Sequence, residues 1–173
     1  EYLSHNFREI FLRAINPFGH AIKNRDENYY HVEDFFAFYK NSLNYILELN
    51  RRGIYFVETY TKLILTKMLT PFPIGFVDLQ SPAGIINNVI VYNYNGKVYP
   101  SDEARMLAEM GDDYFCLGSL KTNAYEEIFN GEKANQIADC WSNECLAGCS
   151  ECAFQVYCGA DPVRNYSTQG DMY

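Results

Sequence analysis

The chain has 173 residues, of which 48% are hydrophobic and 16% aromatic, and its net charge at pH 7 is −8. That hydrophobic share supplies a packed core and argues against disorder, and the length fits one domain or slightly more. An acidic chain without a basic cluster is a poor nucleic-acid binder, because neutralising phosphates takes clustered Lys and Arg, and no apolar run approaches the ~20 residues of a membrane span.

The first half of the chain has the pattern of strand followed by helices. The run "FREIFLRAINPFG" (Phe7–Gly19) predicts a buried strand that an Asn-Pro turn ends. Apolar residues recur at a spacing near 3.6 across His31–Asn50, which predicts an amphipathic helix that Gly53 ends. A second helix is predicted in "FVETYTKLILTKMLT" (Phe56–Thr70), before two prolines. This order is typical of the closing turns of a βα architecture.

The second half begins with a hairpin pattern. Alternating residues in Val89–Tyr94 and the strand-like Lys97–Tyr99 flank an Asn95-Gly96 pair, which favours a type I′ turn with two positive φ angles. We expect a short helix at Asp102–Met110 and a short strand in Tyr114–Leu120.

The helical pattern resumes before the cysteine-rich end of the chain. Asn123 is the expected cap of a helix through 124–130, and residues 132–140 are also expected to be helical. We therefore predict an α+β protein with one part at residues 1–75 and another at 76–173.

Five of the six cysteines fall between Cys140 and Cys158, in the spacing Cys140-x4-Cys145-x3-Cys149-x2-Cys152-x5-Cys158. Thiolates in such spacing hold iron–sulfur clusters and zinc. The residues alone also leave open buried thiols or a disulfide such as Cys140–Cys145. The sixth cysteine, Cys116, lies in an apolar run and reads as a core residue.

The run "CSECAFQVYCGADP", with "VYNYNGKVYPSDEARML" upstream, resembles the SPASM-type extension of radical SAM enzymes, most of all the maturase of His-Xaa-Ser peptide systems. The resemblance covers about residues 80–173. It implies that residues 1–75 are the last strand and helices of a partial TIM barrel. It also implies an auxiliary [4Fe-4S] cluster held by Cys149, Cys152 and Cys158. Zinc is a possible occupant in aerobic preparations, because thiolate sites without iron readily take it.

Several cysteines of the SPASM pattern are absent here. Ser101, separated from Gly96 by four residues, stands where the pattern has Cys, an earlier cysteine would fall near Ser81, and a later one would fall at Asp161 or Pro162. The resemblance implies that one of two auxiliary clusters is lost as a unit and one is kept. We expect Asp161 to cap backbone N–H groups rather than to bind iron.

The sequence does not decide which residue is the fourth ligand of the retained cluster. The resemblance places it about twenty residues after the core, and the sequence given ends 15 residues after Cys158. Cys145 and Cys140 are the candidates within the chain, and Cys145 is favoured because it is nearer.

The resemblance also defines what a longer parent chain would hold. The sequence starts with Glu1 rather than Met and has no C-x3-C-x2-C triplet, the motif whose cluster binds S-adenosylmethionine. We therefore expect a fragment that is inactive alone, whose missing N-terminal barrel carries S-adenosylmethionine and a second [4Fe-4S] cluster. Arg13 and Asn16 follow the predicted strand and are candidates for binding that cofactor or a peptide.

The resemblance implies a cytoplasmic enzyme that acts on a ribosomally made precursor peptide, with no nucleic-acid or membrane partner. Tyr92, Tyr94 and Tyr99 on the hairpin could carry a peptide, although such an alternation is also an ordinary core face. The alternative is a non-catalytic module that folds around structural zinc and makes protein–protein contacts.

Overall fold

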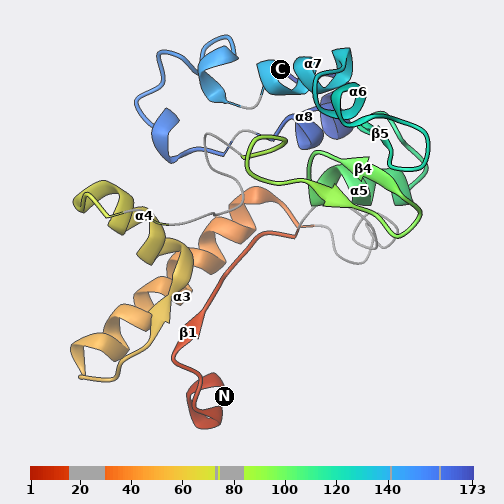
Figure 1. Ribbon diagram of the computed structural model, residues 1–173. Coiled ribbons are helices and arrows are strands. Elements are labelled where there is room, and N and C mark those ends of the chain that lie inside the picture. The colour runs from red at the N-terminus through yellow and green to blue at the C-terminus, as the bar shows by residue number, and fades with distance from the viewer. Residues whose placement is uncertain (16–29, 73, 75–83, 141, 160) are drawn as a thin grey trace. The chain divides into compact units, whose positions relative to one another are not determined.

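The computed structural model describes residues 1–15, 30–72, 74, 84–140, 142–159 and 161–173. These residues form two compact units (Figure 1). The first unit holds the described residues up to position 74, and the second holds those from position 84. The predicted turn at Asn16 and Pro17 lies outside the described residues.

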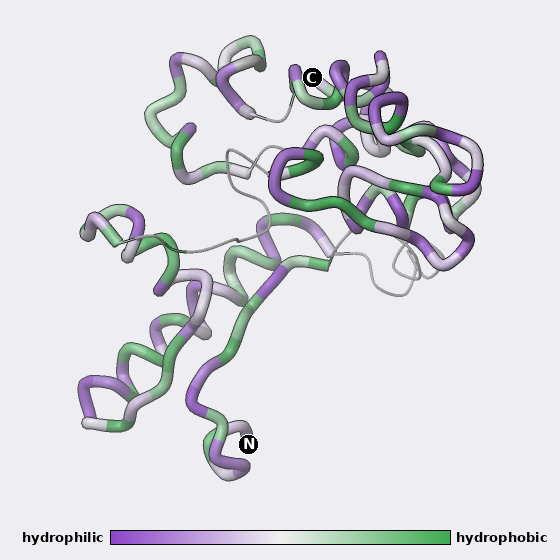
Figure 2. The backbone as a smooth tube through the Cα atoms, in the orientation of Figure 1, coloured by the Kyte–Doolittle hydropathy of each residue, from purple (hydrophilic) through white to green (hydrophobic). Residues whose placement is uncertain are grey.

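The longest element of the first unit is the helix α3 (Val32–Arg51), close to the range predicted. It starts where the His31 N–H donates to the Asp34 carboxylate at 3.2 Å, and it ends before Gly53, whose φ is +79°. Hydrophobic residues recur along it (Figure 2). The buried and half-buried stripe consists of Phe35, Tyr39, Leu43, Ile46 and Leu49.

Two short strands pair in parallel beside this helix. Strand β1 (Glu9–Ile10) pairs with β2 (Val57–Glu58), with Glu9 opposite Val57. The prediction of a long buried strand from Phe7 was wrong, because only two residues pair and Phe7 and Phe11 are exposed. The run from Phe56 was predicted as one helix. It instead divides into β2 and the helix α4 (Thr59–Leu69).

The buried carboxylate of Glu58 joins these elements. It accepts hydrogen bonds from Leu12 N at 3.1 Å, Tyr39 Oη at 2.5 Å, Tyr60 N at 3.2 Å and Thr61 N at 2.6 Å, and so caps α4. Burial raises the pKa of Glu58, but the bonds from Tyr39, Thr61 and Leu12 outweigh burial and hold the pKa below its ordinary value. Burial and the bond to Glu58 raise the pKa of Tyr39 to about 12.

The second unit is built on a three-stranded antiparallel sheet in the order β3-β4-β5. Its strands are β3 (Val91–Tyr92), β4 (Lys97–Tyr99) and β5 (Gly118–Ser119). The predicted hairpin is confirmed as β3 and β4, but its turn is not type I′. The amide of Gly96 donates to Asn93 O at 2.9 Å, and of the two predicted turn residues only Gly96 has a positive φ, so a type I turn is followed by a left-handed glycine.

Four helices pack around this sheet: α5 (Asp102–Glu109), α6 (Tyr125–Phe129), α7 (Glu132–Asp139) and α8 (Pro162–Gln169). Helices α5 and α7 match the predicted ranges. The prediction that Asn123 caps α6 was wrong, because Ala124 is the N-cap residue. The Asn123 side chain instead accepts from Ser119 N at 3.0 Å and so holds the turn after β5.

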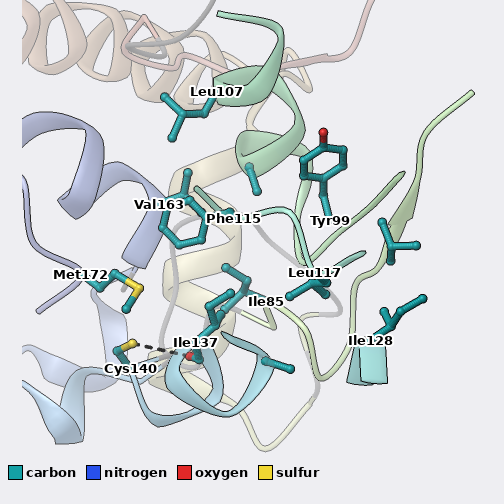
Figure 3. Close-up of a cluster of buried hydrophobic side chains, with 13 residues drawn as sticks. Ile85, Tyr99, Leu107, Phe115, Leu117, Ile128, Ile137, Cys140, Val163 and Met172 are labelled. Carbon is teal, nitrogen blue, oxygen red and sulfur yellow. Dashed lines mark hydrogen bonds between the residues drawn. The ribbon is translucent and has the colours of Figure 1, made fainter. Parts of the chain in front are cut away.

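The hydrophobic core of the second unit gathers thirteen buried side chains from the sheet, the four helices and the C-terminal residues (Figure 3). Val98, Phe115, Ile137 and Val163 are wholly shielded from solvent. Burial of this kind contributes about 25 cal/mol per Å² of apolar surface, which makes the core the main stabilising feature of the unit.

The mixture of helices and short strands confirms the α+β class. The partial TIM barrel stays a prediction, since the described strands of the first unit are a single parallel pair. Among the described helices, none combines the length and the apolar character that a membrane crossing demands.

The Glu58 cluster gives the first testable prediction. Replacing Glu58→Gln removes the charge that four donors face, and the new amide group donates towards backbone N–H groups. We expect the opening free energy of α3 to fall by about 2–4 kcal/mol, measured by amide hydrogen exchange. The control Glu48→Gln alters an exposed pair with Arg51 at 3.4 Å and should change it by less than about 0.5 kcal/mol. Equal effects of the two variants would contradict the role given to Glu58.

Candidate metal centre

The cysteine-rich segment starts at the end of α7, where Cys140 is the C-cap residue. Cys140 is 1% exposed, and its thiol donates to Gln136 O at 2.8 Å. Figure 3 shows its sulfur beside the side chain of Met172, within the hydrophobic core. Cys140 is therefore a core residue, and its side chain packs among apolar neighbours.

The loop that follows is a series of consecutive turns, and each turn begins three residues after the one before it. Each amide in the series donates to the carbonyl three residues earlier, at 3.0–3.1 Å. The series runs through Asn143, Leu146, Cys149, Cys152, Gln155 and Cys158. It includes the short 3₁₀ turns η2 (Asn143–Cys145) and η3 (Gln155–Tyr157). Bonds of this type bring residues i and i+3 within about 7 Å of each other at Cα.

The two ends of this loop are joined by a side chain. Asn143 is 3% exposed, and its Nδ2 donates to Cys158 O at 3.2 Å. Together with the five turn bonds, this bond closes a ring from residue 143 to residue 158. The spacings within C-x2-C-x5-C are three and six residues, so Cys149, Cys152 and Cys158 all stand in the register of the ring. Asn143 could not be recognised from the sequence, because nothing in "WSNEC" distinguishes it from an ordinary loop residue.

The three thiols of the C-x2-C-x5-C pattern are accessible. Cys149 is half-buried, Cys152 and Cys158 are exposed, and all three are free thiols. Within the described residues, no three His, Cys, Asp or Glu side chains stand close enough together to hold a metal ion. The side chain of Cys145, a predicted ligand, lies outside the described part of the chain. The three thiols fit a thiolate-bound centre in their chemistry, because thiolates are the ligands of iron–sulfur clusters.

Two positions at which the resemblance would have cysteine are occupied by helix caps. Ser101 is buried and its Oγ accepts from Ala104 N at 3.2 Å at the start of α5. Asp161 accepts from Val163 N at 3.0 Å and Arg164 N at 3.2 Å at the start of α8, which confirms the prediction that it caps backbone N–H groups. The position near Ser81 lies outside the described residues.

The environment of Asp161 perturbs its titration. Burial raises the pKa of Asp161 to about 6, the charge of Glu103 in α5 adds to the rise, and the bonds from Arg164 and Val163 oppose it. A carboxyl with this pKa is partly protonated in weak acid while it caps α8.

The remaining predicted residues lie apart from the loop in sequence. The Arg13 guanidinium carbon lies 5.2 Å from the centre of the Phe11 ring, and the side chain is exposed. Asn16 lies outside the described residues. The half-buried Cys116 thiol donates to Gly118 O at 3.5 Å beside β5, within the second unit's packing.

The raised pKa of Asp161 yields a pH prediction. Between the ordinary pKa of 3.8 and about 6, the folded chain holds a proton that the unfolded chain has lost, so the contribution of Asp161 to stability declines as pH rises. The free energy of unfolding of the wild type minus that of Asp161→Asn should fall by up to about 3 kcal/mol from pH 4 to pH 7. Urea titrations at each pH measure it. A difference that is independent of pH would refute the assignment.

Comparison with known proteins gives one match. Residues 85–153 match the SPASM family, described as an iron-sulfur cluster-binding domain. This range includes the three-stranded sheet, the helices α5–α7, and Cys149 and Cys152, and it stops short of Cys158. No curated protein and no solved structure matches the chain. The match supports a protein of the radical SAM/SPASM type with an iron–sulfur-binding second unit.

Proposed function

We propose that the chain is the C-terminal part of a radical SAM peptide maturase of the His-Xaa-Ser type, and that its second unit binds one auxiliary [4Fe-4S] cluster. The observation that carries the proposal is the closed loop in which Cys149, Cys152 and Cys158 share one hydrogen-bond register. The SPASM match over residues 85–153 supports the iron–sulfur assignment independently of that geometry.

The proposed cluster would supply one-electron chemistry to the parent enzyme. The residues of this chain hold the cluster and set its surroundings. The three thiols need to be thiolates to bind, and the exposure of Cys152 and Cys158 allows their protons to leave to water. The core fixes the end of α7, where the loop begins, and the start of α8, which follows the loop.

The retained and lost cysteines support a single cluster. Ser101 and Asp161 use their oxygens to cap α5 and α8, so these positions serve the helices. The core of the unit is complete among the described residues around them, with α5 and α8 in contact. A second auxiliary cluster would have to displace both caps.

The fourth ligand is proposed to be Cys145, or a cysteine of a longer parent chain. Cys140 is the weaker candidate, because withdrawing its thiol from the core would break the bond to Gln136 and open a gap beside Met172. The proposal leaves Arg13 and Asn16, in the first part of the chain, as contacts for S-adenosylmethionine or for a ribosomally made peptide in the full-length enzyme.

The second candidate function is a structural zinc module that makes protein–protein contacts. The same loop favours it, because C-x2-C thiols on a turn are also the ligands of structural zinc sites. The two candidates differ in inorganic sulfide, which a cluster contains and a zinc site lacks.

The cluster assignment predicts the composition of the purified chain. Prepared without oxygen and supplied with iron and sulfide, the wild type should be brown and contain iron and acid-labile sulfide in equal amounts. Single Cys→Ser changes at positions 149, 152 and 158 should each remove most of both, because each removes a thiolate ligand. Cys116→Ser is the matched control, since Cys116 is also a free thiol in the second unit, and it should retain both. A colourless wild type with one zinc and no sulfide would overturn the cluster in favour of the zinc module.

The choice of fourth ligand predicts that Cys140 and Cys145 respond differently. Cys140→Ala should keep the metal and lower the free energy of unfolding by about 1–2 kcal/mol, because it leaves a small cavity in the core. Cys145→Ala should leave the fold intact and weaken metal retention. Iron analysis combined with urea unfolding measures both, and loss of iron in Cys140→Ala with full retention in Cys145→Ala would reverse the assignment.

A further inference from the structure

We propose that Asn143 is a positioning residue for the metal centre: by binding the carbonyl of Cys158, it ties the end of the loop to its start and so limits how far the Cys158 thiol can move from Cys149 and Cys152. This inference rests on the proposed metal-binding function and extends it to a residue outside the cysteine pattern. The juxtaposition joins two residues that are 15 positions apart in the sequence.

The burial of Asn143 supports this role. It is one of three polar or charged residues among the described buried positions, and it is 3% exposed. Burying an amide costs free energy unless its polar atoms are hydrogen-bonded. The bond from Nδ2 to Cys158 O at 3.2 Å satisfies part of that requirement, so the loop end and the buried amide stabilise each other.

The bond from Asn143 to Cys158 also differs in its sequence span from the other bonds of the loop. The five turn bonds are local, since each joins residues only three apart. Such turns fix neighbouring residues but allow small errors to accumulate along the loop. The Asn143 bond links the two ends of the loop, and it converts an open series of turns into a ring. Closing the ring limits the positions that the Cys158 thiol can sample relative to Cys149 and Cys152.

The consequence is pre-organisation of the ligands. A metal that binds to three separate thiols of a flexible loop must order the loop, and that ordering weakens binding. If Asn143 has already ordered it, removal of the amide should weaken binding even though no ligand atom is lost. Groups that orient metal ligands through hydrogen bonds typically change metal affinity by about 10–100-fold.

The test is a titration of the reduced 173-residue chain with Co²⁺ under anaerobic conditions, followed by the absorption bands of thiolate-bound cobalt. Asn143→Leu keeps nearly the shape of the side chain and removes its N–H donor. We expect it to bind Co²⁺ about 10–100-fold more weakly than the wild type, with weaker tetrahedral bands per bound metal. Far-UV circular dichroism checks that the variant is folded.

The matched control is Asn165→Leu. Asn165 lies in α8 of the same unit, and its Nδ2 also donates to a backbone carbonyl, that of Met172, at 3.3 Å. This bond lies outside the 143–158 loop, so the affinity of the variant for Co²⁺ should stay within about 3-fold of the wild type. Equal losses in both variants would show a general effect of destabilisation and overturn the proposal, and so would unchanged affinity in a folded Asn143→Leu.

A second measurement covers the case in which Asn143→Leu does not fold, and it uses the wild type alone. The side-chain amide resonances of ¹⁵N-labelled protein are followed while Zn²⁺ is added. Those of Asn143 should shift and exchange more slowly with water as the loop tightens, and those of Asn165 should stay in place. An unmoved Asn143 signal in zinc-saturated protein would overturn the proposal. A wild type that shows no thiolate bands with Co²⁺ would overturn the metal-binding function itself, whereas binding unaffected by Asn143 would overturn only this inference.

Discussion

Hydrogen bonding between residues three apart is the constraint on which the proposed metal centre depends. The amides of Leu146, Cys149, Cys152, Gln155 and Cys158 each donate to the carbonyl three positions earlier, and the Asn143 side chain returns from the first turn to the last carbonyl. Because the cysteine spacings are multiples of three, the same backbone bonds that shape the loop also decide where the thiols stand. The spacing C-x2-C-x5-C therefore matches the hydrogen-bond register of the backbone.

The rest of the second unit supports this loop from both ends. Helix α7 precedes the loop and ends at the buried Cys140. Asp161 follows the loop and is the N-cap residue of α8. Thirteen side chains of the core hold the helices in place. Where the SPASM resemblance would have further cysteines, Ser101 and Asp161 satisfy backbone N–H groups at helix starts. The absence of thiols at these positions is thus compatible with a stable unit, because each oxygen accepts a hydrogen bond from helix N–H groups that have no partner within the helix.

The sequence predicted the elements whose signals are local. The stripe from Phe35 to Leu49 defines α3, and Asn95-Gly96 defines the hairpin, although the geometry of its turn was assigned wrongly because Asn95 does not take a positive φ. Strand β2 was missed because its pairing with β1 spans nearly fifty residues and leaves no local pattern. Glu58 and Asn143 were missed for the same reason: their roles arise from distant donors and acceptors, Leu12 N for one and Cys158 O for the other. The cysteine core stays a prediction from the spacing, and the bond that closes the loop between Asn143 and Cys158 could not be predicted from the sequence.

The most direct measurement of the central claim is residue-resolved alkylation of the thiols, read by mass spectrometry before and after metal loading. If Cys149, Cys152 and Cys158 share one centre, their reaction rates should fall together and in proportion to the metal bound, because coordinated thiolates are withdrawn from the alkylating reagent. Cys116 should react at an unchanged rate. A loaded chain in which any one of the three keeps its original rate would contradict the account.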